Sequence, residues 1–218
     1  MADTETMTTE QIWRAVAAER MSLIELLETL SEDEWDHGSL CAGWRVRDVV
    51  AHIVLSTNAG IGWILVNLIR ARGNLHRAIR DTAIRHADNT TTAQLLTELR
   101  DGIGLRVTPV GTTAADRLMD LLVHGQDIAT PLGITREMPL DAARLALERV
   151  WTTDMSGCRT KLAGYRLVAT NADWIAGAGL AIEGPVAALL LLVAGRRAGR
   201  DLLTGTGAAR LIADESPR

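Results

Sequence analysis

The 218-residue sequence predicts a mainly helical N-terminal domain followed by a small α+β domain. Up to about residue 155, apolar residues recur every three to four positions, as they do on the buried faces of amphipathic helices. After Ser156 the spacing changes to two, and residues 165–170 have the alternation of a short strand. We therefore expect an up-and-down helical bundle over residues 1–155 and a small α+β domain over residues 156–218.

Capping signals and chain breakers locate the helices of the expected bundle. Thr8 and Ser31 each begin a capping-box pattern, which is typical of a helix start. Gly73, Pro109 and Pro131 follow helical stretches and mark their ends. The expected helices cover, in order, residues 8–30, 46–72, 75–86, 95–107, 113–129 and 141–151, with Gly60 and Gly62 inside the second.

In the C-terminal part, the turn signal at residues 171–173 separates the first expected strand from two more, at 174–177 and 180–184. Pro185 then begins an apolar helix over residues 186–194, which is far shorter than the ~20 residues that cross a bilayer. We expect this helix to be buried against the small sheet.

Composition excludes several classes of partner. The net charge of −4 gives no basic surface for nucleic acid, and no block of charge suits a membrane surface. The N-terminus is polar and acidic, unlike a signal peptide. Two cysteines do not make a disulfide framework. We expect a cytoplasmic protein with no nucleic-acid and no membrane partner.

Asp120 and His124 are the first candidate ligands for a metal ion. They are four residues apart in the expected helix over 113–129, so they lie on one helical face. Such a pair can bind one metal ion, but the same spacing also occurs in hydrogen-bonded or solvated helix pairs. Asp116 shares this face, whereas Asp127 is better placed for a cap or for a contact behind the ligands.

His52 is the third candidate, because it interrupts the apolar stripe of residues 46–54. A histidine in such a stripe is either a core side chain bonded to a carbonyl or carboxylate, or a ligand held on a rigid helix. His37, His76 and His86 stand among polar residues, and we expect them at the surface.

Two further residue types need an interpretation. Cys41 precedes the turn at Gly43 and Trp44 and could approach a metal site, although a small buried cysteine is the more common role. The arginines between residues 75 and 86 are expected at the surface, with capture of an anionic substrate carboxylate as the alternative.

Two motifs of this sequence resemble the mycothiol-dependent maleylpyruvate isomerase family. They are Cys41-Ala-Gly-Trp44-Arg-Val-Arg-Asp48-Val-Val-Ala-His52-Ile and Asp120-Leu-Leu-Val-His124-Gly-Gln-Asp127-Ile. The resemblance covers nearly the whole chain and implies a DinB-like four-helix bundle with a small α+β C-terminal domain. It also implies that His52, Asp120 and His124 bind one divalent metal ion, most typically zinc. The family usually has glutamate in place of Asp120, so here the helix must come closer or the carboxylate must bind differently.

Two imidazoles and one carboxylate leave a coordination position open, as in catalytic zinc sites. A thiol bound at such a position loses its proton. The resemblance therefore implies a metal-dependent isomerase or S-transferase that uses mycothiol, or another low-molecular-weight thiol, and acts on a small electrophilic substrate. The alternatives are a non-catalytic DinB-like protein that binds a small molecule or a metal, and a purely structural Asp/His pairing. No catalytic residue beyond the metal ligands is assigned, and a homodimer is one of the oligomeric states left open.

Overall fold

The computed structural model describes residues 7–58, 75–109, 111–154 and 157–215. Tertiary contacts divide them into two compact units, Thr9–Arg136 and the described residues from Glu137 onward. Within the described part of the chain, no helix has the length and apolar character needed to cross a membrane.

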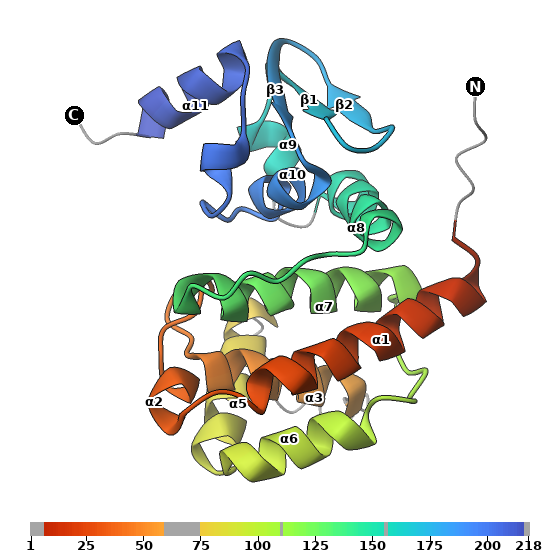
Figure 1. The fold of residues 1–218 in the computed structure, drawn as a ribbon, viewed down its shortest axis with the longest axis vertical. Helices are drawn as coiled ribbons and strands as arrows, with labels where there is room; N and C mark the ends of the chain where they lie inside the picture. Colours follow the sequence, from red (N-terminus) through yellow and green to blue (C-terminus); the bar gives the residue numbers. More distant parts are fainter. Residues whose placement is uncertain (1–6, 59–74, 110, 155–156, 216–218) are drawn as a thin grey trace. The chain divides into compact units, whose positions relative to one another are not determined.

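Four helices of the first unit surround one core (Figure 1). One pair of helices packs against both members of the other pair, so the four close a ring, which confirms the predicted mainly helical bundle. The first pair is α1 (Thr9–Leu27) and α3 (Val46–Asn58), and the second is α6 (Thr92–Asp101) and α7 (Ala114–Ala129). Two more helices contact α3, namely α2 (Glu32–Trp35) and α5 (Leu75–Asp88), and the 3-10 turn η1 (Thr130–Leu132) follows α7.

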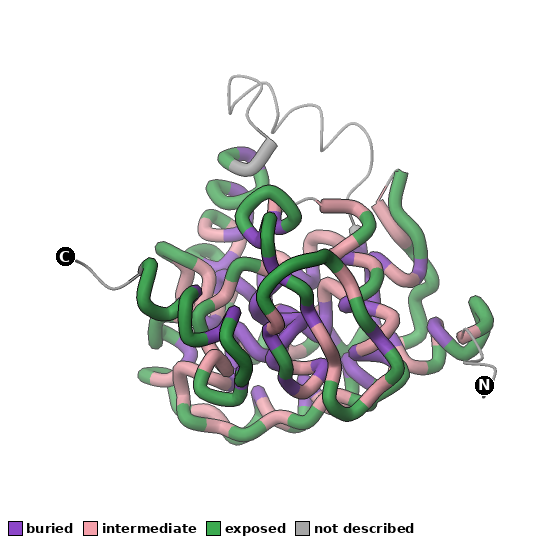
Figure 2. The backbone as a smooth tube through the Cα atoms, turned by 90° about the horizontal axis from the view of Figure 1, so that it is seen from above, coloured by how far each residue is buried: buried purple, intermediate pink, exposed green. Residues whose placement is uncertain are grey.

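The core of the bundle consists of the apolar stripes that the sequence shows. Buried and exposed positions alternate along the helices (Figure 2). Burying each large aliphatic side chain contributes roughly 1.5–3 kcal/mol, so α3 and α7 are held firmly by their apolar faces. The fully buried aliphatic residues include Leu23, Leu27, Ile53, Leu95, Leu118, Leu121, Leu122 and Ile128.

Capping boxes begin three of these helices, with Ser31, Thr91 and Thr113 as the N-cap residues. In each, the N-cap side chain accepts a backbone N–H that the first helical turn would leave unpaired. The expected helix over 46–72 is observed as α3 up to Asn58, and its predicted continuation with Gly60 and Gly62 lies outside the described residues.

Helix α6 ends earlier than the sequence analysis predicted. Periodicity favoured a helix over 95–107, but α6 stops at Asp101 with Gly102 as its C-cap. The Arg20 guanidinium of α1 donates from Nη1 to the carbonyl oxygens of Gly102, Ile103 and Leu105, at 2.6, 3.2 and 2.8 Å. These carbonyls are therefore satisfied by a distant side chain and not by a longer helix.

The second unit contains a three-stranded sheet, as the change to period two predicted. Its central strand β1 (Tyr165–Ala169) pairs antiparallel with β2 (Ile175–Gly177) and parallel with β3 (Leu180–Gly184). The apolar helix α10 (Val186–Val193) packs against β1, and α11 (Thr206–Glu215) packs against β3. The remaining elements are α8 (Leu140–Thr153), α9 (Cys158–Lys161) and the 3-10 turn η2 (Arg200–Leu202).

Glycine makes the short connection between β2 and β3 feasible. The chain passes from one side of β1 to the other through Ala178 and Gly179 alone. Gly179 has a φ of +126°, and a Cβ there would overlap the carbonyl oxygen of Gly164. Only a residue without a side chain fits both constraints.

The contacts divide the chain at a different place from the one predicted between residues 155 and 156. Helix α8 packs against α10, and the boundary of the compact units lies between Arg136 and Glu137. The Trp174 indole N–H donates to Glu148 of α8 at 2.7 Å, and the rings of Trp151 and Trp174 lie edge to face with centroids 6.2 Å apart. An amphipathic helix has the same periodicity whichever core it covers, so its pattern does not reveal its unit.

Candidate metal centre

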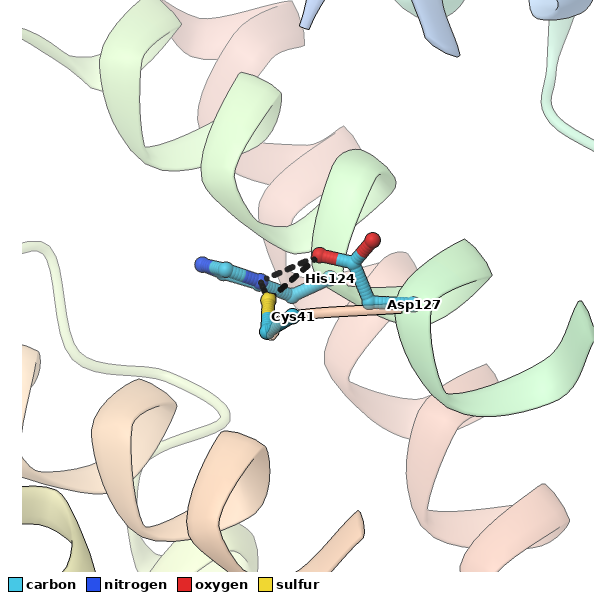
Figure 3. Close-up of side chains that lie close together, drawn as sticks. All are labelled: Cys41, His124 and Asp127. Carbon is cyan, nitrogen blue, oxygen red and sulfur yellow. Dashed lines mark hydrogen bonds and ion pairs between the residues drawn. The ribbon is translucent and has the colours of Figure 1, made fainter. Parts of the chain in front are cut away.

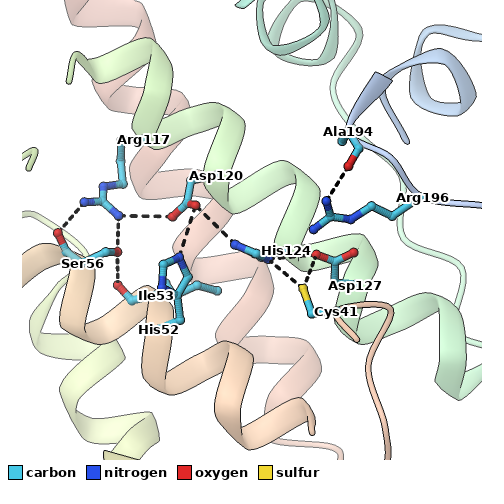
Figure 4. A network of polar contacts seen from close by, with 10 residues as sticks. All are labelled: Cys41, His52, Ile53, Ser56, Arg117, Asp120, His124, Asp127, Ala194 and Arg196. Atoms are coloured by element: carbon cyan, nitrogen blue, oxygen red, sulfur yellow. Dashed lines mark hydrogen bonds and ion pairs between the residues drawn. The ribbon is translucent and has the colours of Figure 1, made fainter. Parts of the chain in front are cut away.

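Two helices of the bundle bring the three predicted ligands together. His52 lies on α3, and Asp120 and His124 lie one turn apart on α7. Asp120 Oδ1 is 3.5 Å from His52 Nε2 and 3.4 Å from His124 Nε2, and the two imidazole rings meet edge on with centroids 5.0 Å apart (Figure 4). One nitrogen or oxygen atom of each residue lies within 4.8 Å of the others.

These separations fit a metal ion. Two ligand atoms that each lie about 2.1 Å from a tetrahedral zinc ion are about 3.4 Å apart. The observed distances between Asp120 Oδ1 and the imidazole nitrogens, 3.4 and 3.5 Å, agree with this separation. Two imidazoles and one carboxylate are also the donor types that zinc accepts in catalytic sites.

The far side of the His124 ring is held by a second carboxylate. His124 Nδ1 lies 2.9 Å from Asp127 Oδ2, and because a carboxylate only accepts, this nitrogen carries the proton. The Cys41 thiol donates to the same Asp127 oxygen at 3.1 Å, with its sulfur 3.8 Å from His124 Nδ1. Figure 3 shows the other ring nitrogen pointing away from both groups, and Figure 4 shows it facing Asp120. A carboxylate behind a histidine ligand fixes the ring and its tautomer, as in many zinc sites.

The turn before α3 positions Cys41 and Trp44 beside the candidate metal centre. The Leu40 N–H donates to the Asp127 carbonyl at 3.0 Å, which ties the turn to the end of α7. Gly43 has a φ of +75°, which lets the chain reverse before Trp44. The Trp44 ring then lies 5.4 Å from the His52 ring and 6.3 Å from the His124 ring, covering both imidazoles on one side.

Arg117 is a residue of the site that the sequence analysis did not identify. Its Nη1 lies 3.4 Å from Asp120 Oδ2, the oxygen that does not face the histidines. The signal in the sequence was its position three residues before Asp120, on the same face of α7. Arginines in helices are usually exposed, so spacing alone did not distinguish it from the surface arginines.

The charges at the centre favour an ionised carboxylate and a protonated imidazole when no cation is bound. Burial opposes ionisation of Asp120, but His124 and His52 outweigh it and hold the pKa of Asp120 well below its usual value. Burial likewise opposes protonation of His124, but Asp120, Asp127 and Cys41 raise its pKa well above the usual value. A cation at this site therefore competes with a proton on the His124 ring.

The first unit matches a family of known proteins. Residues 16–108 match the family model described as "Mycothiol maleylpyruvate isomerase N-terminal domain". Over these residues the helical unit of this chain is similar to that family. The match includes His52 and ends before α7. Asp120 and His124 therefore lie outside the matched residues, and the packing of α7 against α3 brings them to His52.

Solved structures have a similar fold. The chain is similar to the crystal structure of the mycothiol-dependent maleylpyruvate isomerase, with 16% identity, a TM-score of 0.65, and coverage of 93% of this chain and 94% of that one. A histidine-to-alanine mutant of that isomerase matches with the same TM-score and coverage at 15% identity. Among curated proteins, none matches this sequence.

Other candidate side chains of the helical unit have different partners. Asp116 caps α7, because its carboxylate accepts the Thr113 N–H at 2.7 Å. His86 is bonded to Glu98 at 2.7 Å, and the exposed His37 contacts its neighbouring carbonyl, so neither reaches the centre. The side chain of His76 lies outside the described residues.

The contacts of Cys41 and of Arg77 bear on two further expectations. Cys41 is only partly buried and bonds to Asp127, so of its two expected roles the structure favours the approach to the site over the small buried cysteine, whereas Cys158 is buried. Arg77 pairs with Asp81 at 3.8 Å on the exposed face of α5.

Proposed function

We propose that the chain is a metal-dependent enzyme that uses mycothiol, or another low-molecular-weight thiol, as an isomerase or S-transferase acting on a small electrophilic substrate. The observation that carries this proposal is Asp120 Oδ1 between two imidazole nitrogens at 3.5 and 3.4 Å. The similarity of the helical unit to the mycothiol maleylpyruvate isomerase N-terminal domain supports the thiol as co-substrate.

His52, Asp120 and His124 would hold the ion, with zinc as the ion that best suits them, although nickel or iron accepts the same donors. These three ligands would leave one coordination position free, where a thiol would lose its proton. Asp127 keeps the His124 proton on Nδ1, so that Nε2 offers its lone pair to the ion. The Trp44 ring lies beside both imidazoles.

The isomerase reaction needs a substrate double bond conjugated to a carbonyl group. One carbon of that double bond accepts the thiol sulfur, and the π electrons move to the carbonyl oxygen. The carbon–carbon bond is then single and rotates, after which the electrons return, the double bond re-forms and the thiol leaves. In an S-transferase the adduct takes up a proton instead and is released with the new carbon–sulfur bond.

Metal analysis of protein purified without chelator is the first test. We expect about one equivalent of zinc per chain, removable by chelator, and mycothiol-dependent isomerisation of maleylpyruvate or conjugation of an electrophile that returns when zinc is restored. Absence of metal at every pH would contradict the proposal and favour a structural Asp/His pairing. A bound metal without turnover of any electrophile would favour the non-catalytic binding protein.

Cobalt substitution tests the thiol position independently of turnover. Adding mycothiol to the cobalt form should produce a sulfur-to-metal charge-transfer band, because the open position accepts sulfur. A spectrum that stays unchanged at saturating thiol would contradict a thiol-binding centre.

A further inference from the structure

The two oxygens of Asp120 face different partners. Oδ1 faces the imidazoles of His52 and His124, whereas Oδ2 lies 3.4 Å from Arg117 Nη1 (Figure 4). A carboxylate whose second oxygen is taken by a guanidinium has one oxygen left for a cation. The arrangement thus favours coordination through Oδ1 alone.

Arg117 is itself anchored across the helix interface. Its Nη1 donates to Ser56 Oγ at 2.5 Å, and its Nη2 donates to the Ser56 carbonyl at 2.6 Å. Ser56 lies one turn after His52 on α3, so the guanidinium joins α3 to α7 beside the ligands. The Ser56 hydroxyl donates in turn to the Ile53 carbonyl at 2.8 Å, which orients it toward Arg117.

The burial of Arg117 shows that this contact is built into the core. Its side chain is only 2% exposed, and its Nε has no hydrogen-bond partner among the described residues. Burying a guanidinium is costly unless its bonds repay the loss of water. Three hydrogen bonds from Nη1 and Nη2 to Ser56 and Asp120 offset this desolvation cost.

Two roles for Arg117 predict opposite effects on metal affinity. As a charge alone, a cation beside Asp120 weakens the attraction of the site for a second cation. As a brace, the guanidinium keeps α3 near α7, so that the short aspartate side chain reaches the ion held by both histidines. The two-point anchoring on Ser56 points to the brace, since a counter-charge needs no such geometry.

We propose that Arg117, anchored on Ser56, is a positioning residue that holds α3 and α7 at the spacing Asp120 needs for binding a divalent metal through Oδ1. This inference rests on the proposed metal centre and adds the residue that sets its geometry. It concerns the affinity and coordination of the ion and does not depend on which electrophile is the substrate.

The test measures zinc affinity by competition with a chromophoric chelator. Arg117→Met removes both charge and brace, while Arg117→Lys keeps the charge but loses the two-point anchor. We expect both variants to bind zinc about tenfold more weakly or worse, as is typical when support behind metal ligands is lost. Tighter zinc binding by Arg117→Met, with Arg117→Lys unchanged, would overturn the proposal in favour of a simple counter-charge.

Coordination gives a readout that mere loss of stability would not change. In the cobalt form, Arg117→Met should alter the d–d bands, because the freed Asp120 oxygen can also bind the ion. Asp120→Glu should then recover zinc affinity in the Arg117→Met background, since its extra methylene replaces the lost approach of the helices. An unchanged cobalt spectrum together with no rescue by Asp120→Glu would overturn the positioning role.

A second pair of variants changes less of the core and separates loss of the Ser56 anchor from misfolding. Ser56→Ala removes one of the two anchors and should weaken zinc binding severalfold in a protein whose circular dichroism is unchanged. The matched control is Thr57→Val, which removes a similar hydroxyl bond, from Thr57 to the Val54 carbonyl, on the same turn without touching Arg117. Equal effects of the two variants would count against the proposal. A parent protein that binds no zinc would instead refute the proposed function.

Discussion

His124 is the residue on which the candidate centre depends most, because each of its ring nitrogens faces a different carboxylate. Asp120 lies at Nε2 and Asp127 at Nδ1, both on the same helix. The ring is therefore oriented before any ion binds, and a bound cation meets a preformed set of donors.

We predict that Asp120→Ala, His124→Ala and His52→Ala each reduce metal stoichiometry, because each removes one of three ligands. His86→Ala is the control, since His86 is also an imidazole paired with a carboxylate, Glu98, but lies elsewhere. Metal content per folded chain, measured after gel filtration, should stay at the parent value only in the control. An equal loss in all four variants would indicate general destabilisation.

Asp127→Asn should weaken zinc binding about tenfold, because the neutral amide holds the Nδ1 proton of His124 less firmly. Competition with a chelator measures this change. Asp116→Asn is the matched control on the same helix: it weakens the cap of α7, and so its stability, but should leave zinc affinity unchanged. Similar losses of affinity in both variants would contradict the role given to Asp127.

At this scale the sequence predicted which side chains meet, but not what supports them. Asp120 and His124 follow from helical spacing, and His52 from its place in an apolar stripe. Arg117 could not be found this way, because whether a helical arginine is buried depends on the helices packed around it. The role of Cys41 stayed open for a similar reason, since its partner Asp127 is remote in sequence.

Among the elements, α1 and α6 are joined by a buried polar contact as well as by apolar packing. Arg20 is 1% exposed and donates to three carbonyl groups just beyond α6. Burial lowers its pKa to about 10, with the nearby charge of Arg117 acting in the same direction. The guanidinium thus supplements the Gly102 cap by binding carbonyl groups beyond the end of α6.

Arg20→Met should lower the free energy of unfolding by about 3 kcal/mol, because three carbonyl oxygens lose a charged donor. Urea denaturation of the metal-free protein measures this loss. Arg14→Met on the same helix removes an exposed ion pair with Glu10 and should cause no measurable change. A stability of Arg20→Met equal to that of Arg14→Met would show that the carbonyls find other donors.

The residue at which a helix ends and the unit to which a helix belongs were the hardest features to predict from the sequence. The capping signals at Thr8 and Ser31 located the starts of α1 and α2, since they act within one turn. The end of α6 instead depends on Gly102 and on Arg20, which is distant in the chain. Local rules therefore located starts better than stops.

For the whole molecule, the contacts and the sequence pattern offer two divisions of the chain. The pattern divides it after residue 155, whereas α8 packs against α10 and moves the boundary of contacts to Glu137. Periodicity could predict two kinds of unit, but only tertiary packing decides which core receives α8.

Limited proteolysis with intact-mass readout distinguishes the two divisions. We expect the first cut between residues 135 and 140, because a cut there leaves α8 with the sheet and its contact from Glu148 to Trp174 intact. A first cut between residues 152 and 161 would instead favour domains of residues 1–155 and 156–218. Early cuts inside α3 would argue against both divisions.

The position of the candidate ligands on two helices has a thermodynamic consequence. His52 and Asp120 are far apart along the chain, so an ion held by both would act as a cross-link that the unfolded chain cannot keep. Binding to the folded state alone stabilises it by about 2.7 kcal/mol when the free ion exceeds its dissociation constant a hundredfold. The supply of metal in the cell would then set the lifetime of this protein against proteolysis as well as its activity.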